Sequence, residues 1–262
     1  MAQFWFFLDG KAVGFILLIT IMLLALYYMN SKREVNVRRV AALDAIDEGI
    51  GRSAEMGRPV INSIGTCDGG MSTWTVSALS ILKYVASKCV ELGIPLYVPL
   101  GGSEAVYTPM EVARDIVRTE YEMAGKVDEY RPDNLPFLSG RQFSWAVGYV
   151  GMMLRLKPGV NVLLGEQMGT AMYLSEVGHE VGALQISGAH YISNIACLAA
   201  SADYLAIGED MLAAGAYLSK DPNQLASIRA SDLMKYVFIV VLVVGAVLST
   251  FGNKIVTTLL GY

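Results

Sequence analysis

The chain has 262 residues and a formal net charge of -4, and 54% of its residues are hydrophobic whereas only 17% are charged. The acidic balance leaves no basic surface for nucleic acid, so nucleic-acid-binding proteins are excluded. The apolar excess is too large for an ordinary soluble enzyme and predicts transmembrane helices beside one globular domain.

The cysteines indicate a reducing compartment and no metal centre. Cys67, Cys89 and Cys197 are widely spaced, none forms a CxxC pair, and only two histidines accompany them. This supply is too small for a His/Cys zinc site, and an odd count fits reduced thiols better than a disulfide framework. We predict no metal, and the sequence identifies no cofactor.

The first apolar run, residues 12–29, predicts a membrane-spanning helix. It contains no charge, and at 1.5 Å per residue it reaches about 27 Å, close to the hydrocarbon thickness of a bilayer. A cleaved signal peptide is the alternative, but no small-x-small cleavage site follows the run. Four lysines and arginines follow within residues 32–39, whereas only Lys11 precedes, which places residues 1–11 outside and the following domain in the cytoplasm.

A second span is predicted near the C-terminus. Residues 236–251 carry no charge but reach only about 24 Å, so the helix must continue into residues 252–262, with Lys254 snorkelling toward the outer interface. A short re-entrant C-terminus is the alternative. With a linker helix over residues 221–235, this topology puts both termini outside and makes the lipid bilayer of the cell membrane a partner.

The segment after the first span, residues 30–58, is expected to lead from the membrane to the domain. Val37 to Glu48 has apolar residues at helical spacing and predicts a short amphipathic helix. Gly57 and Pro59 then end any helix.

Residues 59–220 alternate short apolar runs with helical patterns, which predicts a Rossmann-like α/β domain with a doubly wound, mostly parallel five-stranded sheet. The expected strands are residues 60–64, 96–100, 160–164, 183–187 and 204–207. The expected helices are residues 72–92, 109–124, 142–156, 171–181, 192–200 and 209–220. Thr108 is predicted to cap the second of these helices, with Glu111 completing a capping box. Asp128 to Gly140 is predicted to be a surface loop that serves as a lid or subunit contact.

In such a sheet, ligands bind where the strands end and the helices begin. The five loops at that edge all contain glycine, which allows close approach of a ligand to the backbone, although tight turns use glycine anyway. The predicted ligand-binding residues are Gly65, Asp68, Gly69, Gly70, Ser72, Thr73, Gly101, Gly102, Glu104, Glu166 and Gly188. No P-loop lysine or G-x-G-x-x-G is present, and Asp68 favours a polar or cationic group over a phosphate. Ser72 and Thr73 have helix capping as the simpler role.

Catalytic chemistry has one candidate pair in the same loops. Cys67 lies just before a helix, where a thiolate would be stabilised, and His190 on another edge loop would be its base. The alternative is that Cys67 is only a small residue in a turn. Glu104, Glu166 and Glu209 could share an ion or act in acid/base chemistry, or could be solvated and helix-capping carboxylates.

Several segments carry a family resemblance: INSIGTCDGGMSTW, PLYVPLGGSEAVYTPMEVARD, GEQMGT and QISGAHY, between two terminal spans. The sequence resembles a family of prokaryotic integral-membrane proteins known only as a domain of unknown function. The likeness covers residues 37–240 and implies a Rossmann-like cytoplasmic domain between two terminal transmembrane helices. It implies no activity and no site residue.

Two functions therefore stay open. The first is a membrane-anchored, homo-oligomeric scaffold or assembly module, with the Gly-rich loops as the place for a small ligand. The alternative is a membrane-bound enzyme that acts on a nucleotide-like or membrane-derived small molecule. Transport is disfavoured because the core of neither span contains an ionisable residue.

Overall fold

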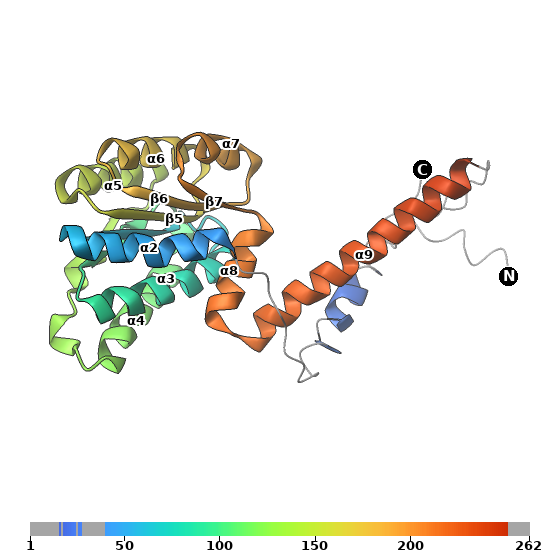
Figure 1. Cartoon of the computed structure of the whole chain (residues 1–262), viewed down its shortest axis with the longest axis horizontal. Helices are drawn as coiled ribbons and strands as arrows, with labels where there is room; N and C mark the ends of the chain where they lie inside the picture. Colours follow the sequence, from blue (N-terminus) through green and yellow to red (C-terminus); the bar gives the residue numbers. More distant parts are fainter. Residues whose placement is uncertain (1–15, 17, 25, 28–39, 251–262) are drawn as a thin grey trace. The chain divides into compact units, whose positions relative to one another are not determined.

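The structure is a computed structural model, and it describes residues 16, 18–24, 26, 27 and 40–250 (Figure 1). The chain divides into two compact units. One is Val37–Ser219, and the other combines the two terminal segments. Each unit is described by itself below.

The larger unit is built on a five-stranded parallel sheet with the order β2-β1-β5-β6-β7. Its strands are β1 (Val60–Gly65), β2 (Leu96–Tyr97), β5 (Val160–Glu166), β6 (Leu184–Ala189) and β7 (Tyr204–Ile207). Counted within this sheet the order is 2-1-3-4-5, the flavodoxin-like form of a doubly wound sheet, whose direction of winding reverses between β1 and β5. The predicted α/β fold with a five-stranded parallel sheet is confirmed.

Helices cover both faces of the sheet (Figure 1). One layer consists of α2 (Ala41–Met56), α3 (Thr73–Leu92), α4 (Tyr107–Met123) and α8 (Glu209–Ser219). The other consists of α5 (Gln142–Leu156), α6 (Ala171–Glu180) and α7 (Ile192–Ser201). Each layer forms its own hydrophobic core against the sheet, and every residue of β1 and β5 is buried. Burial on both faces explains why these strands are continuous apolar runs rather than alternating ones.

A buried polar chain connects the second layer to the sheet. The Tyr149 hydroxyl on α5 donates to Asn161 Oδ1 over 2.6 Å, and Asn161 Nδ2 donates to Gln185 Oε1 over 2.7 Å. Buried polar groups must be paired, so these three side chains fix the register of α5, β5 and β6.

The strand predicted at residues 96–100 is two separate strands. β2 belongs to the main sheet, whereas β3 (Leu100–Gly101) pairs in parallel with β4 (Phe137–Ser139) in a second, two-stranded sheet. The segment predicted as a free surface loop contains β4 and the 3-10 turns η3 (Val127–Glu129) and η4 (Pro132–Asn134). Pairing with β3 ties it to the domain, which sequence spacing alone did not reveal.

The predicted cap of α4 is wrong. A 3-10 turn, η2 (Glu104–Val106), runs directly into the helix, which therefore begins at Tyr107 and places Thr108 inside its first turn. Pro109 is tolerated there because the first turn has no backbone acceptor for its missing N–H.

Helix α2 belongs to the first of the two helix layers of the larger unit. It buries Leu43, Ile46 and Ile50 in the first core and ends at Gly57, whose φ of 63° is left-handed. Gly49 lies inside the helix. A Cβ at Gly49 would lie 2.7 Å from Val160 Cγ2 and 2.9 Å from Leu184 Cδ2. The missing side chain lets α2 approach the sheet closely.

The terminal unit contains α9 (Pro222–Thr250), one continuous helix over the predicted linker and span. Within the described part of the chain, its residues Pro222–Leu248 form the helix that is long and apolar enough to cross a membrane, with a mean hydropathy of 2.1. Residues 16, 18–24, 26 and 27 of the first predicted span are helical. The rest of that span and the predicted extension over residues 252–262 lie outside the described residues.

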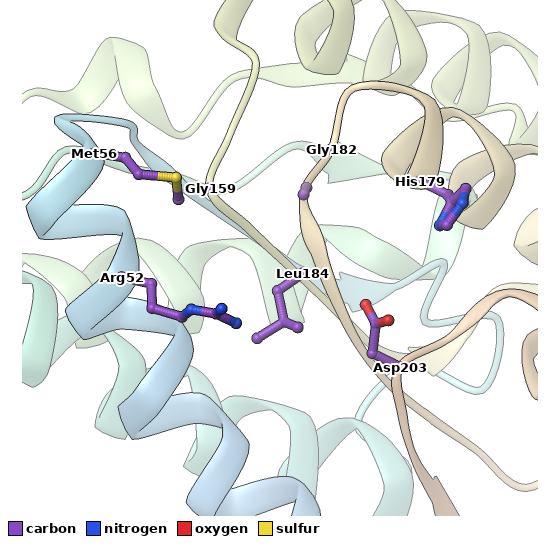
Figure 2. Close-up of a pocket in the computed structure, with 8 residues that line it drawn as sticks. Arg52, Met56, Gly159, His179, Gly182, Leu184 and Asp203 are labelled. Atoms are coloured by element: carbon purple, nitrogen blue, oxygen red, sulfur yellow. The ribbon is translucent and has the colours of Figure 1, made fainter.

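A pocket of about 350 Å³ opens at the amino ends of β5, β6 and β7 (Figure 2). It lies at the edge of the sheet opposite to the Gly-rich loops, because in parallel strands all amino ends share one edge. Its lining residues are Arg52, Met56, Gly159, His179, Gly182, Ala183, Leu184 and Asp203.

Two glycines of α2 give a matched stability test. Gly51→Ala adds a methyl group where nothing lies within 4 Å, so it should raise the free energy of unfolding by about 0.5–1 kcal/mol. Gly49→Ala forces its methyl group against Val160 and Leu184 and should lower it by about 1–3 kcal/mol. Urea unfolding of both variants in detergent measures the difference, and equal effects would contradict the tight packing of α2.

Candidate functional site

The carboxyl ends of β1 and β5 meet at the switch point of the sheet. Gly65 and Gly165 both have left-handed φ values, 84° and 85°. A Cβ at Gly65 would lie 2.5 Å from the Glu166 nitrogen, and one at Gly165 would lie 2.4 Å from the Ile64 oxygen. Glycine is therefore required at both positions by the close approach of the two strand ends, whether or not a ligand binds there.

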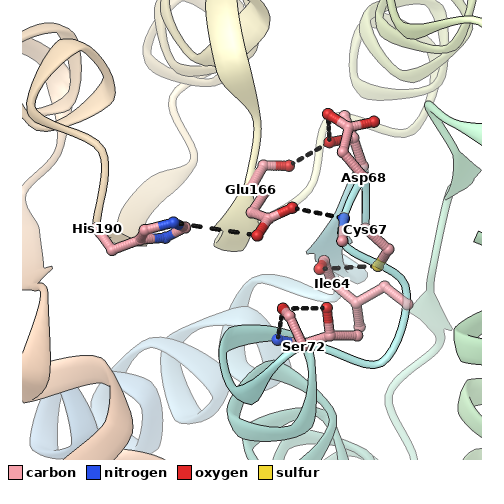
Figure 3. A network of polar contacts seen from close by, with 9 residues as sticks. Ile64, Cys67, Asp68, Ser72, Glu166 and His190 are labelled. Carbon is pink, nitrogen blue, oxygen red and sulfur yellow. Dashed lines mark hydrogen bonds and ion pairs between the residues drawn. The ribbon is translucent and has the colours of Figure 1, made fainter. Parts of the chain in front are cut away.

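Glu166 connects the loops that surround this point (Figure 3). Its side chain is buried, and Oε2 accepts a hydrogen bond from the Gly69 N–H over 3.3 Å. Its Oε1 lies 4.0 Å from His190 Nε2 on the loop after β6. Its carbonyl oxygen accepts from the Thr66 N–H and lies 2.9 Å from Thr66 Oγ1, which is also 3.1 Å from Asp68 Oδ2. One buried carboxylate thus holds the β1 and β6 loops together.

His190 closes one side of this network. Its ring stacks on Trp74 with centroids 4.2 Å apart and an interplanar angle of 3°, and the Tyr191 ring lies 4.1 Å away. Burial lowers the pKa of His190, and the nearby Glu166 carboxylate only partly opposes this effect, so the ring is neutral at pH 7. Its Nδ1 is buried and has no hydrogen-bond partner among the described residues.

Cys67 is buried beneath the same loop and faces the backbone. Its Sγ lies 3.6 Å from the Ile64 oxygen and 3.7 Å from the Gly65 oxygen. The pKa of the thiol is raised to about 12, chiefly by burial; a hydrogen bond with Thr75 opposes this rise, and the Glu166 and Asp68 carboxylates add to it. No hydrogen bond between Cys67 and His190 occurs in the described part of the chain. A protonated, enclosed thiol favours the packing role over the nucleophile.

The remaining predicted residues divide between this network and structural roles. Ser72 is the N-cap of α3 and accepts from the Thr75 N–H over 3.2 Å, and Thr73 is the first residue of that helix. Gly70, with φ 63°, closes the turn by donating to the Cys67 oxygen. Capping and turn closure account for these three positions.

The loop after β3 joins the network through Thr66. Gly101 and Gly102 have φ values of 139° and 101°, and a Cβ at Gly102 would lie 2.7 Å from Thr66 Cγ2. Ser103 Oγ donates to the Thr66 oxygen over 2.7 Å. Glu104 is exposed on η2 and has no hydrogen bond or ion pair to this network in the described structure.

Gly188 lies in β6, one residue before the carboxyl end of the strand, rather than in the loop that follows. It is buried, and a Cβ there would lie 3.0 Å from Leu164 Cδ2 and 3.4 Å from Met211 Cγ. Its role is to leave room for the first hydrophobic core.

Two residues of the site were missed by the sequence analysis. Trp74 lies one residue into α3 and covers His190, and Gln167 follows Glu166 with Nε2 donating to the Leu164 oxygen over 2.6 Å. Gln167 Oε1 is buried without a partner among the described residues. The sequence could have identified Gln167, because it follows Glu166 directly in the segment GEQMGT. It could not have identified Trp74, because the stack of Trp74 on His190 joins segments that are far apart in the chain.

Five carboxylates lie at or near this edge: Asp68 in the β1 loop, Glu104 on η2, Glu166 at the end of β5, and Glu209 and Asp210 in the first turn of α8. Across the described residues, no group of three or more His, Cys, Asp or Glu side chains is arranged to hold a metal ion. The acidic character favours a cationic or hydrogen-bond-donating ligand over an anion at this edge.

A family model described as a domain of unknown function, DUF6754, matches residues 2–260. The chain belongs to this family. The match spans both terminal segments and the whole α/β unit, so the two units occur together in the family's pattern. Comparison with curated proteins finds no match, and comparison with solved structures finds none either.

Thiol reactivity tests the environment of Cys67. Because burial raises the pKa of Cys67 and Cys89 to about 12, almost no thiolate forms at pH 8, and both should resist iodoacetamide in the folded protein. Cys197 is only half-buried and should be alkylated first. Mass spectrometry of peptides before and after unfolding measures the order, and fast labelling of Cys67 in the folded chain would restore it as a nucleophile.

The pH dependence of stability tests the burial of His190. Its folded pKa lies below the ordinary value of 6.5, so between the two values the unfolded chain binds more protons. The free energy of unfolding should therefore fall as the pH drops through this window. His190→Asn should remove that part of the slope between pH 7.5 and pH 5 in thermal unfolding. His179→Asn, at the exposed end of α6, is the control, and a slope unchanged by His190→Asn would contradict the assignment.

Proposed function

We propose that this protein is a membrane-anchored, homo-oligomeric assembly module whose α/β unit associates with other copies through the outer face of α5. The supporting observation is that α5 presents large apolar side chains on its exposed side as well as on the side that packs against the sheet. A helix that is apolar all round is normally buried.

The inner side of α5 fills the second core with Trp145, Tyr149 and Met153. The outer side presents Phe143, Val147 and Leu154, which are 64%, 72% and 48% exposed. These three residues follow spacings of four and seven, so they form one stripe along the helix. The sequence of α5 has a single charged residue, Arg155, in its last turn.

The neighbouring helices extend this apolar surface. Met172 and Tyr173 at the start of α6 are 60% and 58% exposed, and Ile192 at the start of α7 is 85% exposed. All three helices belong to the same layer over the sheet (Figure 1). Exposed apolar side chains on neighbouring helices of one layer are typical of a protein-interaction surface.

A second copy of the chain is the occupant that these features favour. The stripe carries Gly151 between Val147 and Leu154, and its one charge is the Arg155 guanidinium, whose Nη1 would lie 3.1 Å from a Cβ at Gly151. With Arg155 turned aside, two copies of α5 can pack closely about a twofold axis. A charged partner would find no complementary charge on the stripe other than Arg155. Anchoring through α9, and through the first predicted span, would confine copies to two dimensions and raise their effective concentration.

The contacts at the carboxyl edge of the sheet also support this proposal. The Glu166 carboxylate accepts from the Gly69 N–H of the β1 loop, and the His190 ring of the β6 loop stacks on Trp74. These contacts within the chain suit a structural module. In the proposed topology both termini face outside and the α/β unit lies in the cytoplasm, at the cell membrane.

The test is the mass of the complex extracted gently in a nanodisc. Val147→Glu places a carboxylate in the centre of the stripe and should shift the protein from an oligomer to a monomer by native mass analysis. Met123→Glu, on α4 of the opposite layer, replaces a residue with 66% exposure and should leave the oligomer intact. An oligomer that survives Val147→Glu would overturn the α5 interface, and a monomeric wild type would overturn the assembly role itself.

A second candidate is a membrane-bound enzyme or ligand-binding domain that takes a nucleotide-like or membrane-derived small molecule at the carboxyl edge. The observation that favours it is the pair of buried, unpartnered atoms beside Glu166, His190 Nδ1 and Gln167 Oε1. Unsatisfied buried polar atoms in a native structure often indicate a functional site. The alkylation experiment on Cys67 tests the nucleophile of this alternative.

A further inference from the structure

The pocket at the amino edge of the sheet belongs to none of the surfaces above. It is formed by the last turns of α2, by the turns before β5, β6 and β7, and by the end of α6. Its volume of about 350 Å³ lies within the range of sites for small molecules. It opens on the side of the sheet away from the Glu166 network, so a ligand here would be independent of that network.

Asp203 contributes a fixed negative charge to this pocket. Its Oδ2 accepts a hydrogen bond from the Gln185 N–H over 2.8 Å, and its own N–H donates to the Gln185 oxygen over 3.0 Å. These two bonds hold the carboxylate in one position before β7. Its Oδ1 has no hydrogen-bond partner among the described residues, so one oxygen is available to a ligand.

Arg52 contributes a positive charge from the other wall. Its contact with Glu48 is a loose one, 3.8 Å between side chains that are both about 60% exposed, and such pairs contribute little. In Figure 2 the Arg52 guanidinium and the Asp203 carboxylate flank the Leu184 side chain. No Arg52–Asp203 ion pair within 4.0 Å occurs in the described structure, so the two charges stay separate.

We propose that this pocket binds a small zwitterion, such as a free α-amino acid. Its carboxylate would pair with Arg52 and its ammonium group with Asp203 Oδ1, while an apolar side chain would lie on Leu184 and Met56. A plain anion would be repelled by Asp203 and a plain cation by Arg52, so opposite charges on one molecule are the pattern that both walls select.

The glycines of the pocket keep it open. Gly182 has φ 73° and ends α6, and no atom lies within 4 Å of the Cβ that it lacks. A Cβ at Gly159 would lie 2.3 Å from Ser53 Oγ, so this glycine lets α2 approach and places Arg52 at the rim. Gly49, one turn before Ser53 in α2, allows the same close packing of this helix on the sheet. The position of Arg52 therefore depends on both glycines.

The experiment uses the full chain in a nanodisc and isothermal titration with the free amino acids, first as groups and then singly. The expected result is saturable binding of at least one amino acid with an apolar side chain. The corresponding amine without the carboxylate, and the acid without the amino group, should each bind at least about tenfold more weakly.

Variants that remove one charge at a time test the contribution of each wall of the pocket to binding. Arg52→Gln should weaken binding of the amino acid at least about tenfold, and so should Asp203→Asn, which keeps an oxygen to accept from the Gln185 N–H. Arg118→Gln is the matched control, because Arg118 is 62% exposed and pairs with Glu122 on the distant α4. Thermal unfolding of each variant checks that the fold is kept.

Three outcomes would overturn the proposal. No saturable binding by any amino acid would remove the ligand class, and equal binding of the acid or the amine would remove the zwitterion in favour of a single charge. Binding that survives both Arg52→Gln and Asp203→Asn would place the ligand elsewhere. None of these outcomes depends on the oligomeric state, so the result stands apart from the test of the α5 surface.

Discussion

The close approach of β1 and β5 at their carboxyl ends is the constraint on which the rest of the α/β unit depends. Gly65 and Gly165 allow the backbones to meet where any side chain would collide, and Glu166 then bonds to the Gly69 N–H across the gap. The β1 loop is thereby held over the switch point, which brings α3 and Trp74 against His190. A buried carboxylate is a costly feature, and this one ties the end of β5 to the β1 loop.

The three surfaces that could contact a ligand or a partner lie in different parts of the domain. Ligands of doubly wound proteins ordinarily occupy the carboxyl edge, where this protein has the Glu166 hydrogen bond and the Trp74–His190 stack. A pocket lies at the amino edge, between Arg52 and Asp203. The proposed protein-facing surface is a third one, the outer side of α5, which belongs to neither edge.

The α5 surface and the apolar α9 helix present the same physical problem. Both leave large hydrophobic areas exposed in a single chain, and water does not favour either exposure. A bilayer around α9 and a second copy against α5 would remove both areas from water. The proposed assembly therefore follows from apolar surface that the single chain does not cover, and the family match over residues 2–260 keeps both units in one protein.

The sequence by itself determined the elements whose signal is local. The α5 boundaries, Gln142–Leu156, and the β7 boundaries, Tyr204–Ile207, agree with the apolar patterns, because helix and strand periodicity are written in consecutive residues. It also identified Glu166 and His190 as edge residues, since Glu166 ends one buried strand and His190 follows another. It failed at Thr108, where a preceding 3-10 turn moved the start of the helix, and it ended the fourth strand before Gly188, which lies within β6 against the first core.

Only the tertiary structure decided the strand order, the pairing of β3 with β4, the Trp74–His190 stack, the burial that keeps Cys67 a thiol, and the pocket between Arg52 and Asp203. Each of these joins segments that are far apart in the chain. A single sequence records which residues are apolar or charged, but the distance between two distant side chains is set by how the layers pack, and packing depends on all segments together.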